Sequence, residues 1–201
     1  MRNIPGLPSW LVLAWLIIAP VGPMAYADSP APLPTSAQAD TMPNPFERGS
    51  TYWSETVGVS YDASLGQIYY LQSLVSYYPV DDVAIECGGM FAYADARRTP
   101  AGALGGPELG MRWHFAKSAQ WSTYVEGLFG AVLQQHPLAV NTLRFNFDLQ
   151  PGGGATYRLN DQTLLHCGFR WHHLSNAQVR GRAHNFGYDG PSLYVGLERS
   201  F

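Results

Sequence analysis

Apolar and polar residues alternate along most of the chain that follows residue 50. In the stretch 121–133, Trp121 and Val125 fall on one face of an extended strand, whereas Ser122 and Glu126 fall on the other. Successive side chains of a β-strand point to opposite faces, so this alternation predicts strands rather than helices. Gly, Pro, Asp and Asn residues separate the alternating stretches. The pattern predicts eight strands, at 51–61, 68–78, 83–94, 108–116, 121–133, 142–159, 163–175 and 192–201.

The two faces of these strands differ in a way that favours a membrane barrel over a soluble sandwich. Strands of about ten residues suffice to cross the hydrocarbon core when they are tilted. A sandwich would solvate its polar face, whereas here that face mixes charges of both signs that can pair inside a narrow lumen. We therefore predict an all-β, eight-stranded antiparallel transmembrane β-barrel filled by side chains. The expected lumen charges are Glu86, Glu108, Arg112, Glu126, Arg144, Asp148, Arg158 and Arg170.

The connections between the predicted strands give the expected orientation. Those at 79–82, 117–120 and 160–162 are tight, whereas those at about 95–107, 134–141 and 176–191 are longer. Short turns face the periplasm and long loops face outward in outer-membrane barrels. The strand at 163–175 then runs outward. Phe201 fits an aromatic C-terminus, although Arg199 falls on the outward face and would have to extend to the periplasmic rim.

The N-terminal region has the features of an export signal. Arg2 precedes an apolar run at 10–19, and Ala25-Tyr26-Ala27 fits a signal-peptidase site. The apolar run is too short to span a bilayer as a helix. Residues 28–50 are rich in Pro, Ala, Ser and Thr and show no periodicity. We expect a signal peptide at 1–27, a disordered leader at 28–50 and a β-barrel at 51–201.

Composition agrees with a membrane protein and excludes one class of partner. Only 13% of residues are charged, about half the usual fraction of a soluble domain, and 13% are aromatic. The formal net charge is −3 and no basic patch occurs, so nothing indicates nucleic-acid binding. Cys87 and Cys167 fall on different strands, and we interpret them as small wall residues rather than a disulfide.

One histidine and one serine stand out at the end of the strand 163–175. Phe169, Trp171, His173 and Ser175 share the outward, apolar face. The spacing of two residues places the imidazole near the hydroxyl, as it must be to take a proton from a serine nucleophile. Such a pair would lie on the lipid-facing wall at the depth of the outer leaflet. His-x-Ser alone is a weak pattern, and a polar strand end would look the same.

Further residues around this pair resemble a known family. These are His-x-Ser-Asn-Ala at 173–177, Asn-x-Gly-x-Asp at 185–189, and Arg-Phe-Asn-Phe at 144–147 with the glycine-rich run behind it. In these motifs, and more loosely over about 52–201, the chain resembles the lipid A 3-O-deacylases of bacterial outer membranes, the PagL-like family of eight-stranded barrels.

The resemblance implies a site and a reaction. Ser175 would be the nucleophile, His173 the base and Asp189 the acid that orients the base. Main-chain amides after Ser175, together with Asn176 or Asn185, would be oxyanion donors. The substrate would be the ester-linked 3-hydroxyacyl chain at position 3 of lipid A, cleaved by water without a metal or organic cofactor. The family's acid is often glutamate, so the reach of the shorter Asp189 depends on its loop.

Other polar residues have less specific interpretations. His172 falls on the lumen face, where we expect a structural network, and no strand fixes His184 in its loop. Arg180 and Arg182 lie in the outer loop, where they could contact lipid A phosphates or simply be solvated. The glycines at 152–154 lack the Lys-Ser/Thr of a phosphate loop and fit a bend in a strand.

Three functions remain open from the sequence. The first is an outer-membrane esterase that acts on lipid A, with its reactive residues on the apolar face. The second is a non-enzymatic barrel with a structural, adhesive or protective role. The third is an enzyme such as an acyltransferase, with its reactive residues in the lumen. The face on which His173 and Ser175 fall favours the first. Whether the barrel forms a homodimer is left open by the sequence.

Overall fold

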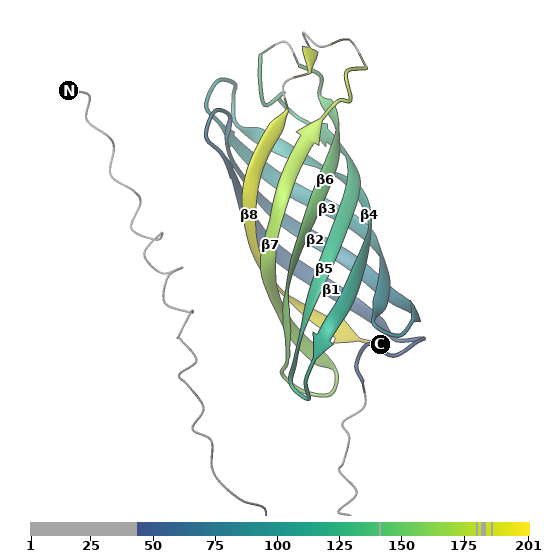
Figure 1. Cartoon of the computed structure of the whole chain (residues 1–201). Coiled ribbons are helices and arrows are strands. Elements are labelled where there is room, and N and C mark those ends of the chain that lie inside the picture. Colours follow the sequence, from purple (N-terminus) through teal and green to yellow (C-terminus); the bar gives the residue numbers. More distant parts are fainter. Residues whose placement is uncertain (1–43, 141, 180, 182–183, 186) are drawn as a thin grey trace, which may run out of the picture. The chain divides into compact units, whose positions relative to one another are not determined.

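Eight antiparallel strands form a closed barrel in which β8 pairs with β1 (Figure 1). The structure is a computed structural model and describes residues 44–140, 142–179, 181, 184–185 and 187–201. The predicted fold class is confirmed. The strands are β1 Thr51–Asp62, β2 Gly66–Val80, β3 Val83–Ala96, β4 Gly102–Lys117, β5 Trp121–Gln134, β6 Phe145–Arg158, β7 Thr163–Ser175 and β8 Tyr188–Ser200.

Several strand ends differ from the predicted ones. The connection expected to be long, at 95–107, consists only of residues 97–101, because β4 includes the run of small residues that precedes residue 108. Gly105 and Gly106 lie so close to the neighbouring strands that a Cβ atom would meet their main-chain oxygens. These glycines therefore permit close strand pairing instead of marking a loop. β8 begins at Tyr188 rather than at residue 192, and β6 begins at Phe145 rather than at 142.

The two ends of the barrel carry connections of different length. At one end, here called the turn end, the connections are 81–82, 118–120 and 159–162, and the C-terminus lies there as well (Figure 1). At the other end, the loop end, the connections are 63–65, 97–101, 135–144 and 176–187. β7 runs from the turn end to the loop end, as the sequence predicted, so Ser175 lies at the loop end.

The outer wall is apolar and the lumen is polar at its centre. Trp113, Phe129 and Leu193 are each more than half exposed on the outer face, among many other large apolar side chains. The expected lumen charges at 86, 108, 112, 126, 148 and 170 are buried. Arg144 was expected in the lumen but is exposed, because it precedes the start of β6.

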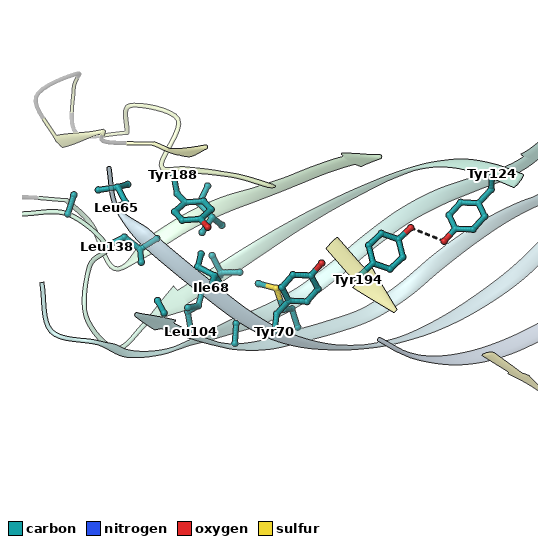
Figure 2. Close-up of a cluster of buried hydrophobic side chains, with 14 residues drawn as sticks. Leu65, Ile68, Tyr70, Leu104, Tyr124, Leu138, Tyr188 and Tyr194 are labelled. Carbon is teal, nitrogen blue, oxygen red and sulfur yellow. Dashed lines mark hydrogen bonds between the residues drawn. The ribbon is translucent and has the colours of Figure 1, made fainter. Parts of the chain in front are cut away.

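The buried side chains form three layers along the barrel axis. A cluster near the loop end includes Leu65, Ile68, Leu104, Leu174 and Tyr188 (Figure 2). A smaller cluster near the turn end consists of Phe46, Tyr52, Tyr78, Ala84 and Leu164. Charged residues occupy the layer between them. Apolar packing thus seals both ends of a polar interior and keeps water away from its charges.

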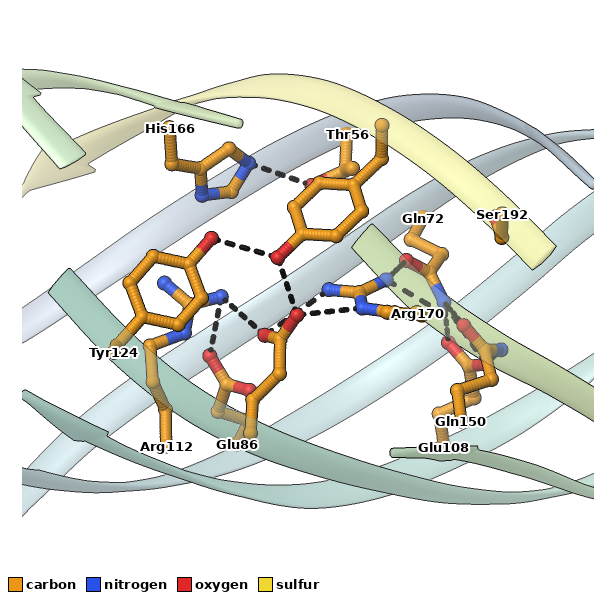
Figure 3. A network of polar contacts seen from close by, with 12 residues as sticks. Thr56, Gln72, Glu86, Glu108, Arg112, Tyr124, Gln150, His166, Arg170 and Ser192 are labelled. Carbon is orange, nitrogen blue, oxygen red and sulfur yellow. Dashed lines mark hydrogen bonds and ion pairs between the residues drawn. The ribbon is translucent and has the colours of Figure 1, made fainter. Parts of the chain in front are cut away.

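Two arginines organise the central layer (Figure 3). Arg112 pairs with Glu86 at 3.0 Å, with Glu126 at 3.3 Å and with Glu198. Arg170 donates from Nε to Glu126 Oε1 at 2.7 Å. Arginine suits such a layer because its planar guanidinium can donate to several acceptors at once.

A short segment before β1 packs against the turn end. Phe46 is buried and its ring stacks on that of His114, with 3.6 Å between the ring centroids. The main chain is fixed as well, because the Asp82 N–H donates to the Phe46 carbonyl at 2.8 Å. The sequence assigned residues 44–50 to a disordered leader, but this aromatic contact holds them in place. The signal peptide and the rest of the leader, 1–43, lie outside the described residues.

The two cysteines form no disulfide with each other. Cys87 and Cys167 are both free thiols and both exposed, on β3 and β7. No helix in the described part of the chain is long and apolar enough to cross a membrane.

Candidate active site

The pairing of β6, β7 and β8 brings the candidate residues together on the outer wall. His173 of β7 lies directly opposite Asp189 of β8, and Ser175 lies opposite Phe147 of β6. Asp189 is thus a strand residue and not part of the preceding loop, because β8 begins at Tyr188. All three polar side chains fall on the outward face that also carries Trp171.

The three polar side chains form a continuous hydrogen-bonded chain. His173 Nδ1 lies 2.7 Å from Asp189 Oδ1, and His173 Nε2 lies 3.1 Å from Ser175 Oγ. With a proton on Nδ1, the imidazole donates to the carboxylate and accepts from the serine hydroxyl. The side chains of His173 and Asp189 are 37% and 49% exposed, so a molecule beside the wall can reach them.

Two residues to which the sequence analysis gave no role, Trp171 and Gly187, lie beside the Asp189 carboxylate. The Trp171 indole Nε1 donates to Asp189 Oδ1 at 3.4 Å. On the other side lies Gly187, where a Cβ atom would be 3.3 Å from Asp189 Oδ2 and 3.5 Å from His173 Cε1. A side chain at this position would thus pack tightly against both the aspartate and the histidine. The glycine of the Asn-x-Gly-x-Asp motif was visible in the sequence, but its position beside His173 and Asp189 was not.

The loop after Ser175 turns sharply and is held by Asn176. Ala177 and Gln178 both have positive φ angles, of 51° and 60°, which few residues with a side chain adopt. The Asn176 N–H donates to Asn185 Oδ1 at 2.9 Å, and Asn176 Nδ2 donates to the His184 carbonyl at 2.7 Å. Asn176 therefore uses its donors within the loop, whereas Asn185 offers its Oδ1 to that loop and keeps its Nδ2 for another acceptor.

The other candidate residues of this loop are Arg180, Arg182 and His184. Arg180 and Arg182, the expected phosphate contacts, lie outside the described residues. His184 is exposed, and its carbonyl anchors Asn176 as described above. Nowhere in the part of the chain that the structure describes do three His, Cys, Asp or Glu side chains gather in a way that could hold a metal ion.

A second serine–histidine–aspartate set lies inside the barrel. Ser60 Oγ is 3.1 Å from His172 Nδ1, and His172 Nε2 is 3.0 Å from Asp148 Oδ1. The Ser60 hydroxyl also bonds to the Tyr188 hydroxyl at 2.8 Å. All three members of the set are buried. The structural network predicted around His172 is confirmed, and no substrate can reach it without opening the barrel.

The fold and the wall site define a membrane-type β-barrel that carries a serine, a histidine and an aspartate in contact on its outer surface. The chain belongs to the lipid A 3-O-deacylase (PagL) family, whose model matches residues 36–198. This membership places the protein among outer-membrane lipid A deacylases. No match was found among curated proteins.

Similar solved structures are other small outer-membrane barrels. Neisserial surface protein A is 13% identical, with a TM-score of 0.53, and the match covers 76% of this chain and 97% of that one. OprG from Pseudomonas aeruginosa is 11% identical, with a TM-score of 0.53 and coverage of 77% and 97%. Outer membrane protein W of E. coli is 12% identical, with a TM-score of 0.51 and coverage of 77% and 99%. At these identities the likeness establishes the fold alone.

Proposed function

We propose that the protein is a serine esterase of the outer membrane that removes the ester-linked 3-hydroxyacyl chain at position 3 of lipid A. The observation that carries this proposal is the position of the His173 imidazole between Ser175 and Asp189 on the outward wall. A nucleophile, a base and an orienting acid in this order are what acyl transfer to serine requires. Family membership supports lipid A as the substrate.

The reaction runs in two halves. Ser175 Oγ attacks the ester carbonyl while His173 Nε2 takes the hydroxyl proton, and Asp189 stabilises the imidazolium through Nδ1–H. The tetrahedral intermediate collapses, and His173 gives the proton to the departing 3-oxygen of the sugar, which leaves as a free 3-hydroxyl. Water then attacks the acyl-serine with the same base, releasing the 3-hydroxy fatty acid and restoring the Ser175 hydroxyl. No step needs a metal or an organic cofactor.

Asn185 is the side chain best suited to stabilise the oxyanion. Asn176, the other candidate, already donates from both its main-chain and side-chain nitrogens to the loop. Because Asn185 accepts through Oδ1 from the Asn176 N–H, its Nδ2 group is directed elsewhere and can donate to a developing negative charge. Arg180 and Arg182 stay candidates for the phosphates of lipid A.

The setting of the site suits a lipid substrate. Phe147 lies opposite Ser175 and Leu149 lies opposite His173 on β6, and both belong to the apolar outer wall. The Phe147 ring stacks on Phe129 of β5, with 5.8 Å between centroids. An acyl chain that lies along this wall would bring its ester to the loop end, where the serine is. Loops that face outward would place the site at the outer leaflet, which contains lipid A.

The test is a mass spectrum of lipid A after incubation with the folded, purified protein. We expect loss of one 3-hydroxyacyl mass with the parent and no loss with Ser175→Ala, because the nucleophile is missing. Ser60→Ala is the matched control, since it removes the serine of the buried set and should leave turnover intact. Loss of turnover in Ser60→Ala but not in Ser175→Ala would move the chemistry to the lumen. An inactive, folded parent would favour a non-enzymatic barrel.

A further inference from the structure

Asp62, at the loop end of β1, joins the first strand to the strand that carries Asp189. Its Oδ2 accepts the Asp189 main-chain N–H at 2.9 Å, although the two residues are 127 positions apart in the sequence. Its Oδ1 accepts from Ser64 N–H and Ser64 Oγ–H, each at 2.7 Å, and from Leu65 N–H at 3.0 Å. Asp62 is 7% exposed. Both oxygens of this buried carboxylate therefore accept hydrogen bonds, Oδ1 from the turn after β1 and Oδ2 from the main chain of β8.

The bond from Asp189 to Asp62 extends the seam between β1 and β8. The regular pairing of these strands ends where Ser60 lies opposite Ser192, and Asp62 lies beyond that point. Gly190 permits the close approach there, because a Cβ atom at this position would collide with the Tyr61 carbonyl oxygen. The Asp62 carboxylate thus accepts the Asp189 N–H where regular pairing would supply a main-chain carbonyl of β1.

The direction of the Asp189 N–H also affects the Asp189 side chain. The N–H and C=O groups of one strand residue point to the same neighbouring strand, so those of Asp189 point to β1 and away from β7. His173 and Asp189 then form a pair without main-chain hydrogen bonds between them. In such pairs the Cα atoms are closer, at about 4.5 Å, and so are the side chains. This arrangement favours the short contact between His173 Nδ1 and Asp189 Oδ1.

We propose that Asp62 is a positioning residue of the esterase site, which holds the Asp189 main chain so that its carboxylate meets His173. This inference rests on the proposed function. Asp62 contacts no reacting atom and acts only through Asp189. A misplacement of about 1 Å can cost a catalytic group about a hundredfold in rate. The hydrogen bond from the Asp189 N–H to Asp62, here called the clamp, therefore affects the chemistry by fixing the main chain of the acid.

Asp62→Asn should remove the hydrogen bond to the Asp189 N–H and keep the hydrogen bonds within the turn at Ser64 and Leu65. An amide has one oxygen, which can keep the bonds to the Ser64 and Leu65 N–H groups of the turn, where asparagine is well tolerated. Its NH2 group then faces the Asp189 N–H, and two donors cannot bond to each other. The turn is retained and the clamp is lost. We expect kcat on lipid A to fall about tenfold with little change in KM.

Two control variants match this substitution. Asp95→Asn removes a carboxylate from β3 at the same end of the barrel, where it forms no hydrogen bond or ion pair with the described residues. Ser64→Ala removes one bond of the turn and leaves the clamp. Both should keep the parental kcat. Asp62→Asn in an Asp189→Ala background should cause no further loss of kcat, since residues that act through one group are not additive.

A readout that needs no activity is hydrogen exchange at the Asp189 amide, measured in detergent micelles. We expect this amide to exchange faster in Asp62→Asn than in the parent, while the amides of Ser64 and Leu65 stay protected. Unchanged exchange at Asp189 would overturn the clamp, whether or not the protein is an esterase. Faster exchange with a parental kcat would show that Asp62 does not position the acid. Faster exchange in a protein whose parent has no deacylase activity would keep the clamp and reject the proposed function.

Discussion

Two adjacent histidines of β7 have different roles because their side chains point to opposite faces of the strand. His173 points outward and contacts Ser175 and Asp189, whereas His172 points into the lumen and lies between Ser60 and Asp148. Each imidazole thus has a serine on one side and an aspartate on the other. Only the outward set is open to a substrate, because the inward set is fully buried.

Replacing these histidines one at a time should give opposite results. His173→Ala should lower kcat/KM on lipid A by at least about a hundredfold, because the base is lost, and should leave the barrel stable. His172→Ala should lower the free energy of unfolding by about 1–3 kcal/mol, because it removes one buried polar partner from Ser60 and one from Asp148. Deacylation assays and urea unfolding of the same preparations measure both effects. A fully active His173→Ala protein would contradict the proposed mechanism.

At the scale of single residues, the sequence could identify the outward pair but not the support around it. His173 and Ser175 are close in the chain, so the period of a strand suffices to bring them together. The antiparallel return of the last strand and the resemblance both indicated Asp189, but its contact with His173 depends on strand register, which nothing local fixes. Asp62 has the spacing of a turn residue, with Ser64 two positions after it. Its bond to Asp189 depends on closure of the barrel and leaves no trace in the local sequence.

At the scale of elements, the seam between β8 and β1 is the feature on which the site depends most. Gly190 of β8 is buried against the main chain of β1, where a Cβ atom would overlap the Tyr61 carbonyl oxygen. Gly190→Ala should therefore push the two strands apart and lower stability by about 1–3 kcal/mol, the usual cost of overpacking. The same displacement should lengthen the bond from Asp189 to Asp62 and reduce turnover. Thermal unfolding and the lipid A assay would measure the two effects.

Gly127→Ala is the matched control for this substitution. Gly127 lies in β5 on the exposed face, and a Cβ atom there would meet nothing within 4 Å. The new methyl group should leave stability and turnover close to those of the parent. An equal loss of stability in both variants would mean that the effect comes from losing glycine in a strand and not from the seam.

The strands themselves were predictable, and their ends were less so. Alternation identified all eight, because the contrast between apolar wall and polar lumen persists along each of them. The prediction stopped β4 and β8 short at glycine and proline, which usually mark turns. In this barrel glycine is needed inside strands where neighbours come close, as at Gly106 beside Ala131. Pro191 is accommodated just beyond the last regular β1–β8 pair, Ser60 with Ser192.

At the scale of the whole barrel, the lumen is a rigid support for a site on its outer wall. The mixed charges that indicated a closed interior are paired there, with Arg112 among Glu86, Glu126 and Glu198. The sequence predicted that these charges would be buried together. It could not give their pairing, because Glu86 and Glu126 meet Arg112 through the register of the neighbouring strands β3 and β5, and Glu198 meets it from β8 across the lumen.

Removing one centre of this network should destabilise the barrel without changing the chemistry on the wall. Arg112→Met leaves three buried carboxylates without their shared cation, and breaking a buried pair in this way costs about 3–5 kcal/mol. Lys117→Met is the control, since its pair with Asp82 at the turn end is partly exposed and should contribute about 1 kcal/mol or less. Urea unfolding followed by tryptophan fluorescence would give both values. The folded fraction of Arg112→Met should deacylate lipid A at the parental rate, because no member of the network touches His173 or Ser175. Equal losses of stability in the two variants would mean that the buried charges do not hold the barrel together.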